Sequence, residues 1–166
     1  MSIRLPALLI MLCCNLLVQA QVQVQAQALP QLETSFSCNL LRQEGDERLN
    51  FADQAVIQLE GTRIKEFQWE SSLYRSTHGH ECSIDSSDQP LAEVTANGWR
   101  ILLKNSAAAR KTRGYDFDRG LNCSIRLERH GEQLQIRPSC PTLCGSRMNF
   151  SALTVNLRTG SCQYDE

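Results

Sequence analysis

Short segments that alternate apolar and polar residues follow one another along the chain from residue 32 onward. This two-residue period is typical of strands with one buried face, and turn-forming residues separate the segments. The candidate strands are Phe36–Leu41, Asn50–Leu59, Arg63–Trp69, Glu81–Ile84, Trp99–Lys104, Leu121–Arg129, Glu132–Arg137 and Phe150–Leu157. The pattern predicts an all-β fold, an antiparallel sheet sandwich or a small barrel.

One segment departs from this alternation. Ser106–Lys111 contains three consecutive alanines and favours a short helix, so we expect at most one helix. The whole chain has 166 residues, the length of a single domain, and 42% hydrophobic residues are enough for a packed core.

The first twenty residues have the parts of a secretory signal peptide. Arg4 precedes an apolar stretch, Leu5–Val18, and small residues precede the expected cleavage after Ala20. The stretch is shorter than the roughly 20 apolar residues of a membrane-spanning helix, so no stable membrane anchor is expected. A flexible Gln-rich lead-in over 21–31 and one β domain over 32–166 complete the predicted organisation.

Cysteine is the informative residue type. Two of the eight cysteines lie in the signal segment, and the six that remain are Cys38, Cys82, Cys123, Cys140, Cys144 and Cys162. An even number in an exported domain predicts a disulfide-braced fold in a periplasmic or secreted protein.

A hairpin over 123–140 suggests how the cysteines pair. Apolar residues alternate on both sides of a predicted turn at His130-Gly131, and pairing Arg129 with Glu132 brings Cys140 close to Cys123. The predicted bridges are Cys123–Cys140, Cys144–Cys162 and Cys38–Cys82.

Charge is distributed unevenly. Residues 21–96 hold twelve acidic and five basic residues, whereas 97–166 hold eleven basic and six acidic ones. Positive charge is concentrated at Arg100, Lys104, Arg110, Lys111 and Arg113. This segment is interpreted either as a docking face for an acidic protein, an anionic glycan or a membrane headgroup, or as a solvated loop paired with the acidic half. The formal net charge of −1 and the lack of interleaved aromatics favour neither an extended polyanion-binding surface nor a nucleic-acid partner.

Two histidines form the metal-capable cluster. In a strand, His78 and His80 would point to the same side and share a copper or zinc ion. The alternative interpretation is a polar loop tip, because ligands at the usual spacing do not follow.

The segment after Cys144 is a candidate binding loop. Gly145, Ser146 and Arg147 would be held between two disulfides, and a rigid protruding loop loses little entropy on binding. An ordinary connector is the other interpretation. Catalytic motifs such as GxSxG, HExxH or a phosphate-binding glycine loop are missing, so an enzyme is not expected.

The C-terminal stretch carries a resemblance. Cys123-Ser-Ile-Arg-Leu through Gly131 to Cys140, then Cys144-Gly-Ser-Arg and Phe150, resembles modules of small uncharacterised exported bacterial proteins. It is also similar to the periplasmic c-type lysozyme inhibitors, β-barrels that insert a Ser-Gly-x-x-Tyr loop into the enzyme's cleft. The resemblance implies that Ser146 and Arg147 reach the target's catalytic carboxylates.

These observations lead to two hypotheses. The first is an exported non-enzymatic binding protein without a cofactor, whose partner is a protein of the envelope or extracellular space, such as a cell-wall hydrolase or a toxin that it inhibits. Gly145, Ser146, Arg147, Arg100 and Lys104 are its candidate binding residues. The alternative is a periplasmic protein that binds a metal or a small ligand through His78 and His80.

Overall fold

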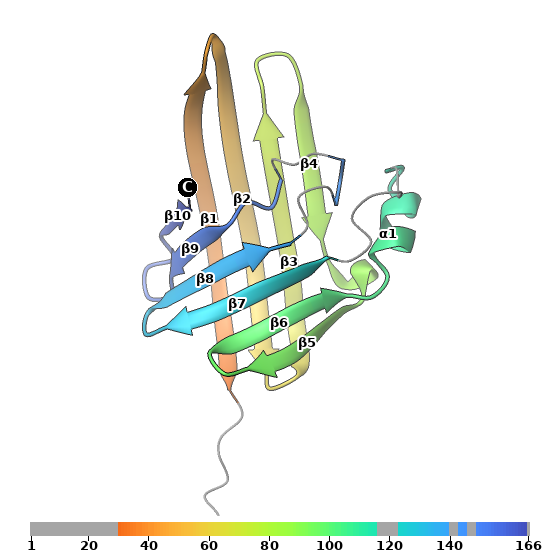
Figure 1. Cartoon of the computed structure of the whole chain (residues 1–166), viewed down its shortest axis with the longest axis vertical. Coiled ribbons are helices and arrows are strands. Elements are labelled where there is room, and N and C mark those ends of the chain that lie inside the picture. Colours follow the sequence, from red (N-terminus) through yellow and green to blue (C-terminus); the bar gives the residue numbers. More distant parts are fainter. Residues whose placement is uncertain (1–29, 116–122, 140–142, 146–148, 166) are drawn as a thin grey trace, which may run out of the picture.

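The computed structural model describes residues 30–115, 123–139, 143–145 and 149–165. In this part of the chain, two antiparallel sheets form a sandwich (Figure 1). The four-stranded sheet has the order β1-β2-β3-β4, with β1 (Gln31–Glu44), β2 (Glu47–Glu60), β3 (Arg63–Tyr74) and β4 (Gly79–Ile84).

The second sheet has six strands in the order β10-β9-β8-β7-β6-β5. They are β5 (Pro90–Thr95), β6 (Gly98–Leu103), β7 (Ser124–His130), β8 (Gln133–Pro138), β9 (Leu153–Asn156) and β10 (Cys162–Tyr164). A 3₁₀ turn, η1 (Ser86–Asp88), precedes β5, and α1 (Ser106–Thr112) follows β6. Figure 1 shows this sheet crossing steeply in front of the other. The predicted all-β sandwich with one short helix is confirmed.

The main core lies between the two sheets. Alternate residues of β2, from Leu49 to Leu59, are buried, as are alternate residues of β6 to β9. Trp69 and Trp99 are the largest fully or almost fully buried side chains, one from each sheet. Burial of an apolar side chain contributes about 1.5–3 kcal/mol, which is why the period-two pattern specifies the faces of the sheets.

The four-stranded sheet is longer than the sheet that covers it. Its β1–β2 and β3–β4 hairpins extend past the six-stranded sheet at the top of Figure 1. There Leu49, Phe51 and Leu73 form a second small cluster, against which Tyr164 of β10 packs. Leu41, at the end of β1, is 62% exposed.

Strands β5 and β10 and the outer part of β1 lack the pattern used for prediction. β5 begins at Pro90 and lies at a sheet edge, and β10 has only three residues. β1 continues to Glu44 through exposed residues because its backbone remains paired with β2 up to Glu47. Backbone pairing extends a strand without any apolar periodicity.

The β7–β8 hairpin has a different register from the predicted one. Its two-residue turn is Gly131-Glu132, so that His130 pairs with Gln133 and Arg129 pairs with Leu134. Gly131 has a positive φ of 62°, which the first position of a tight hairpin turn requires. The predicted turn at His130-Gly131 was therefore displaced by one residue.

Two of the three predicted disulfides are wrong. Cys38 is bonded to Cys162 and Cys82 to Cys144, with Cα–Cα distances of 5.6 Å and 5.8 Å. The prediction of Cys38–Cys82 and Cys144–Cys162 joined cysteines within the same half of the chain. In the sandwich, β10 lies beside β1 and the segment before β9 reaches β4, so each bridge joins the two halves.

The third predicted bridge remains a prediction. Cys123 is disulfide-bonded, but Cys140 lies outside the described residues. Disulfides of this kind indicate an oxidising, non-cytoplasmic environment. Among the described residues, no helix has the length and apolar character needed to cross a membrane.

Candidate functional site

The segment of residues 144–150 is attached to the four-stranded sheet at both of its described ends. We call it the pinned segment. At its start, Cys144 is bonded to Cys82 of β4. At its end, the Nδ2 of Asn149 donates a hydrogen bond to the carbonyl oxygen of Ser71, at 2.9 Å.

The two attachment points are neighbours. Ser71 of β3 and Cys82 of β4 are direct register partners. The backbone N–H of Phe150 also donates to the Oγ of Ser71, at 3.0 Å. Both described ends of the pinned segment are therefore fixed at one rung of the ladder.

Phe150 adopts a backbone conformation that is uncommon for an aromatic residue. Its φ is +54°, and its ring is buried in a T-shaped contact with Trp69, with the ring centroids 5.0 Å apart. Such a left-handed conformation costs about 1–3 kcal/mol and persists where the surroundings hold it, often in functional segments. Here the contact with Trp69 and the bond to Ser71 hold it.

The predicted loop residues are only partly described. Gly145 is exposed with a φ of +77°, and Ser146 and Arg147 lie outside the described residues. The predicted Cys144–Cys162 bridge is wrong: Cys144 is bonded to Cys82, and hydrogen bonds to Ser71 hold the other end. The positions of the cysteines in the sequence give no sign that Ser71 holds this segment, because that contact depends on the register of β3 against β4.

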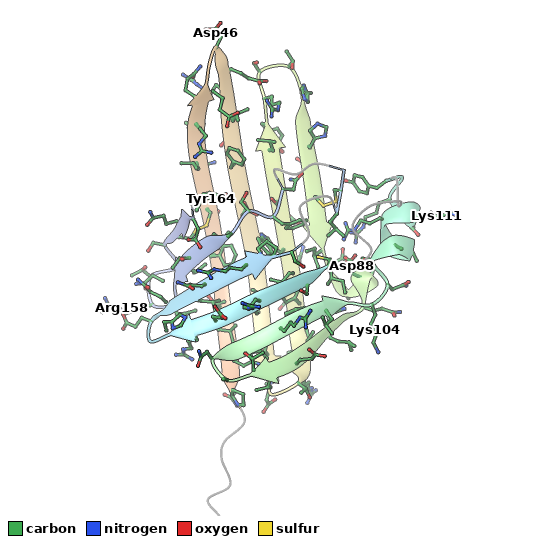
Figure 2. The ribbon with its side chains drawn as sticks, viewed as in Figure 1. Asp46, Asp88, Lys104, Lys111, Arg158 and Tyr164 are labelled. Carbon is green, nitrogen blue, oxygen red and sulfur yellow. A yellow bond between two sulfur atoms is a disulfide. The ribbon has the colours of Figure 1, made fainter. Side chains whose placement is uncertain are left out.

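The basic residues predicted as one group lie in two different environments. Arg100 and Lys104 are exposed, with Arg100 on the outer face of the six-stranded sheet (Lys104 is labelled in Figure 2). Arg110 is buried and Arg113 is partly buried, both engaged with acidic side chains.

Arg100 has basic neighbours that the sequence did not group with it. Arg126 of β7 is the register partner of both Arg100 in β6 and Arg137 in β8. All three side chains are exposed on the outer face of the sheet. We call these three residues the arginine row.

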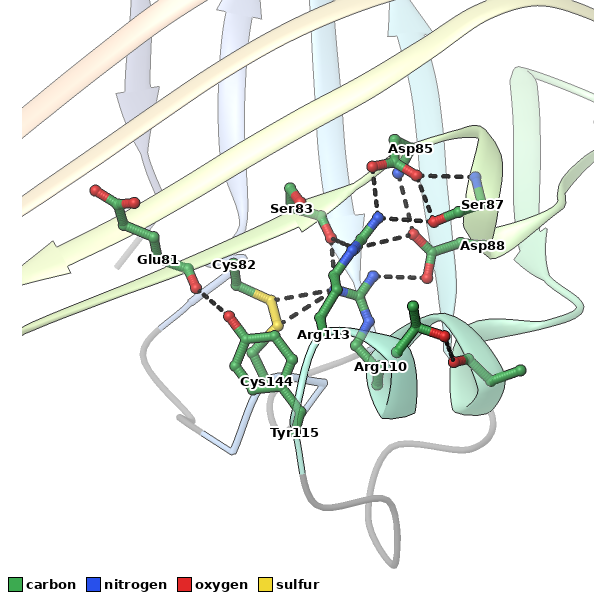
Figure 3. A network of polar contacts seen from close by, with 12 residues as sticks. Glu81, Cys82, Ser83, Asp85, Ser87, Asp88, Arg110, Arg113, Tyr115 and Cys144 are labelled. Atoms are coloured by element: carbon green, nitrogen blue, oxygen red, sulfur yellow. Dashed lines mark hydrogen bonds and ion pairs between the residues drawn. A yellow bond between two sulfur atoms is a disulfide. The ribbon is translucent and has the colours of Figure 1, made fainter.

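Arg110 is the centre of a buried polar network that joins α1 to η1 and β4 (Figure 3). Its Nη2 lies 2.6 Å from the Oδ1 of Asp88, which is fully buried, and its Nη1 donates to the carbonyl oxygen of Ser83 at 2.6 Å. Its Nη1 also lies 3.4 Å from the Sγ of Cys144. Burial lowers the pKa of Arg110, and the charge of Asp88 opposes this shift.

Arg113 extends the network toward solvent. Its Nη2 pairs with Asp85 at 2.5 Å, and its Nη1 donates to the carbonyl oxygen of Ser83 at 3.0 Å. Burial raises the pKa of Asp85, but hydrogen bonds from Ser87 and the charges of Arg113 and Arg110 outweigh it and lower the pKa overall. The network fixes α1 and leaves these two arginines committed to internal partners.

A second buried network surrounds Asp53 of β2. This carboxylate is 2% exposed and accepts hydrogen bonds from the Nε1 of Trp69 at 2.8 Å and the Oη of Tyr164 at 2.7 Å. Burial raises the pKa of Asp53, although bonds from Tyr164, Ser71 and Trp69 oppose the shift. Burial and the nearby charge of Asp53 also raise the pKa of Tyr164. The network ties β10 to the four-stranded sheet.

The two predicted metal ligands lie together at the tip of the β3–β4 hairpin. The rings of His78 and His80 are in a T-shaped contact, with centroids 5.2 Å apart, and both side chains are exposed. The Nδ1 of His78 is 2.8 Å from the Oγ1 of Thr77. In the described part of the chain, no group of three or more His, Cys, Asp or Glu side chains is arranged to hold a metal ion.

Comparison with known proteins finds no family model, no curated protein and no solved structure that matches this chain. The resemblance to lysozyme inhibitors therefore stays an expectation from the sequence.

Proposed function

We propose that this chain is a non-enzymatic binding protein of the periplasm or extracellular space that uses the pinned segment to contact a protein partner. The observation that carries this proposal is the attachment of both ends of the segment to the Ser71–Cys82 rung. Binding through a segment whose ends are already fixed costs less conformational entropy than binding that must order a free loop.

Two further features support a binding role. The strained φ of Phe150 lies at one end of the segment and the exposed Gly145 at the other. The signal-like first twenty residues and the disulfides fit an exported protein. Inhibition of a cell-wall hydrolase or a toxin is the activity that this arrangement suits best, with Ser146 and Arg147 as contact residues.

The first experiment measures inhibition and binding directly. The oxidised protein is assayed against a panel of lysozymes and used as bait in an envelope extract, and each captured partner is then tested by calorimetry. We expect one saturable, stoichiometric partner. Arg147→Ala is expected to weaken the affinity for it by about tenfold or more, the loss of one charged contact.

Matched variants separate the segment from the rest of the surface. Arg158→Ala removes an exposed arginine in the β9–β10 turn and should leave the affinity unchanged. Asn149→Ala releases one end of the pinned segment while the Cys82–Cys144 bond remains, and should weaken binding. Equal affinities for the wild-type protein and Arg147→Ala would rule out the pinned segment as the contact.

A metal-binding role is the second candidate function, because the rings of His78 and His80 are already in contact. Two neighbouring imidazoles are suitable ligands for copper or zinc. Calorimetric titration with each ion should then give a dissociation constant in the micromolar range or tighter, which His78→Ala abolishes. His130→Ala, which removes the exposed histidine at the end of β7, is the control. Absence of a signal with both ions ends this candidate.

A further inference from the structure

The arginine row places like charges directly opposite one another. Arg100, Arg126 and Arg137 occupy successive register positions in β6, β7 and β8. Neighbouring strands are about 5 Å apart, so the row spans about 10 Å across the sheet. Like charges directly opposite in a sheet destabilise it, so the row is unfavourable in the free protein.

Little within the protein neutralises the row. Among the described residues, the row forms one ion pair, between the Nη1 of Arg126 and the Oε1 of Glu128, at 3.8 Å. In the same part of the chain, neither Arg100 nor Arg137 takes part in an ion pair. The side chain of Arg126 remains 62% exposed, and the row is therefore available to an anionic ligand.

The positive charge forms a line one residue wide. Along the strands, the next outward-facing positions on either side of the row are neutral or acidic: Gly98, Leu102, Ser124, Glu128 and Gln135. At one end of the row, Glu93 of β5 is the register partner of Arg100. A line of charge that crosses the strands is better suited to an extended ligand chain than to a broad, flat anionic surface.

We propose that the arginine row binds a linear polysaccharide that carries a carboxylate on each sugar, lying across β6, β7 and β8. A guanidinium group pairs with a carboxylate through two parallel hydrogen bonds, a geometry that lysine does not offer. A polyuronate carries one carboxylate on each sugar along a single chain, as the row carries one arginine on each of three adjacent strands. The inference is independent of the pinned segment, which lies on other elements.

Other polyanions fit the face less well. Single-stranded nucleic acids bind through aromatic side chains on which their bases stack, and no outward-facing position of the described strands β5 to β10 holds an aromatic residue. A bilayer of anionic lipids attracts basic residues spread over a surface rather than a single line. Both are included as competing ligands in the test.

The test titrates the oxidised full protein with polygalacturonate oligomers by calorimetry. The matched ligand is the methyl-esterified oligomer, which has the same sugars without the charges. We expect binding to the free acid only, with an affinity that falls as salt rises. Arg126→Gln, at the centre of the row, is expected to weaken it by about tenfold to a hundredfold.

Two controls distinguish the loss of a charge in the row from a general loss of charge and from a loss of folding. Arg158→Gln removes an exposed arginine outside the row and should leave the affinity unchanged. Because Arg126→Gln relieves like-charge contacts, its melting temperature should equal or exceed that of the wild-type protein.

Three results would overturn the proposal. They are equal binding of the esterified and free oligomers, equal loss of affinity in Arg126→Gln and Arg158→Gln, and absence of binding. Row-dependent binding to anionic vesicles or to single-stranded DNA, without binding to polygalacturonate, would assign the row to that ligand instead.

Discussion

At the scale of single residues, Asp53 shows how the sandwich places an acidic side chain in its core. Asp53 occupies an inward position of β2, in the same stripe as Ala55 and Ile57, and every one of these side chains is buried. Its two oxygens accept hydrogen bonds from Trp69 and Tyr164. No ion pair with Asp53 is formed within the described residues, so burial dominates and its pKa is raised.

This raised pKa predicts a specific pH dependence of stability. The unfolded chain releases the Asp53 proton near its ordinary value of 3.8, whereas the folded protein holds it to higher pH. The folded state then binds more protons in that interval, so the free energy of unfolding falls as pH rises from about 4 toward the raised pKa. This decrease in the free energy of unfolding persists at neutral pH.

Urea unfolding of the wild-type protein and Asp53→Asn, measured between about pH 4 and pH 7, checks this prediction. The difference in free energy of unfolding, wild type minus variant, should decrease as pH rises. Asp46→Asn, at the exposed tip of the β1–β2 hairpin, makes the same chemical change and is the control (Figure 2). A difference for Asp53→Asn that is constant with pH would contradict the prediction.

At the scale of elements, the helix α1 is held by a buried ion pair rather than by an apolar face. It has only seven residues, too short to be stable alone. Arg110 reaches from it to Asp88 in η1 and to the carbonyl oxygen of Ser83 in β4 (Figure 3). The helix therefore depends on these contacts for its position.

Removal of the Arg110 side chain should be costly. Arg110→Met leaves the buried Asp88 without its closest counter-charge and with only Arg113, 3.7 Å away, beside it, and loss of one partner of a buried pair costs about 3–5 kcal/mol. Lys111→Met, one residue further on the exposed side of α1, should change stability by less than about 0.5 kcal/mol. Chemical denaturation at neutral pH measures both variants, and similar free energies of unfolding would contradict the assigned role.

At the scale of the whole molecule, two disulfides between described residues connect distant parts of the chain. Cys38–Cys162 spans 124 residues and joins β1 to β10, which belong to different sheets. Cys82–Cys144 spans 62 residues and joins β4 to the pinned segment. Bridges across long separations restrict the unfolded chain most strongly.

Peptide mapping without reduction should therefore find Cys38 linked to Cys162 and Cys82 linked to Cys144. The double variant Cys38→Ala/Cys162→Ala should lose about 2–5 kcal/mol of stability in denaturant unfolding. A map that links Cys38 to Cys82 would contradict the structure and restore the pairing expected from the sequence.

The sequence alone determined which residues face the core and the class of the fold. Alternation along Asn50–Leu59 and Trp99–Lys104 identifies strands with one buried face because side chains two residues apart on a strand point to the same face. The alanine run likewise identified α1, and the number of cysteines indicated the oxidising compartment.

Only the tertiary structure decided which strands are neighbours. The arginine row, the Cys38–Cys162 bond and the attachment of the pinned segment to Ser71 each join residues that are far apart in the chain. Their proximity depends on strand order and register, which come from the packing of the two sheets as a whole. A pattern within one segment carries no information about its partner strand, and so these sites emerge only in the folded protein.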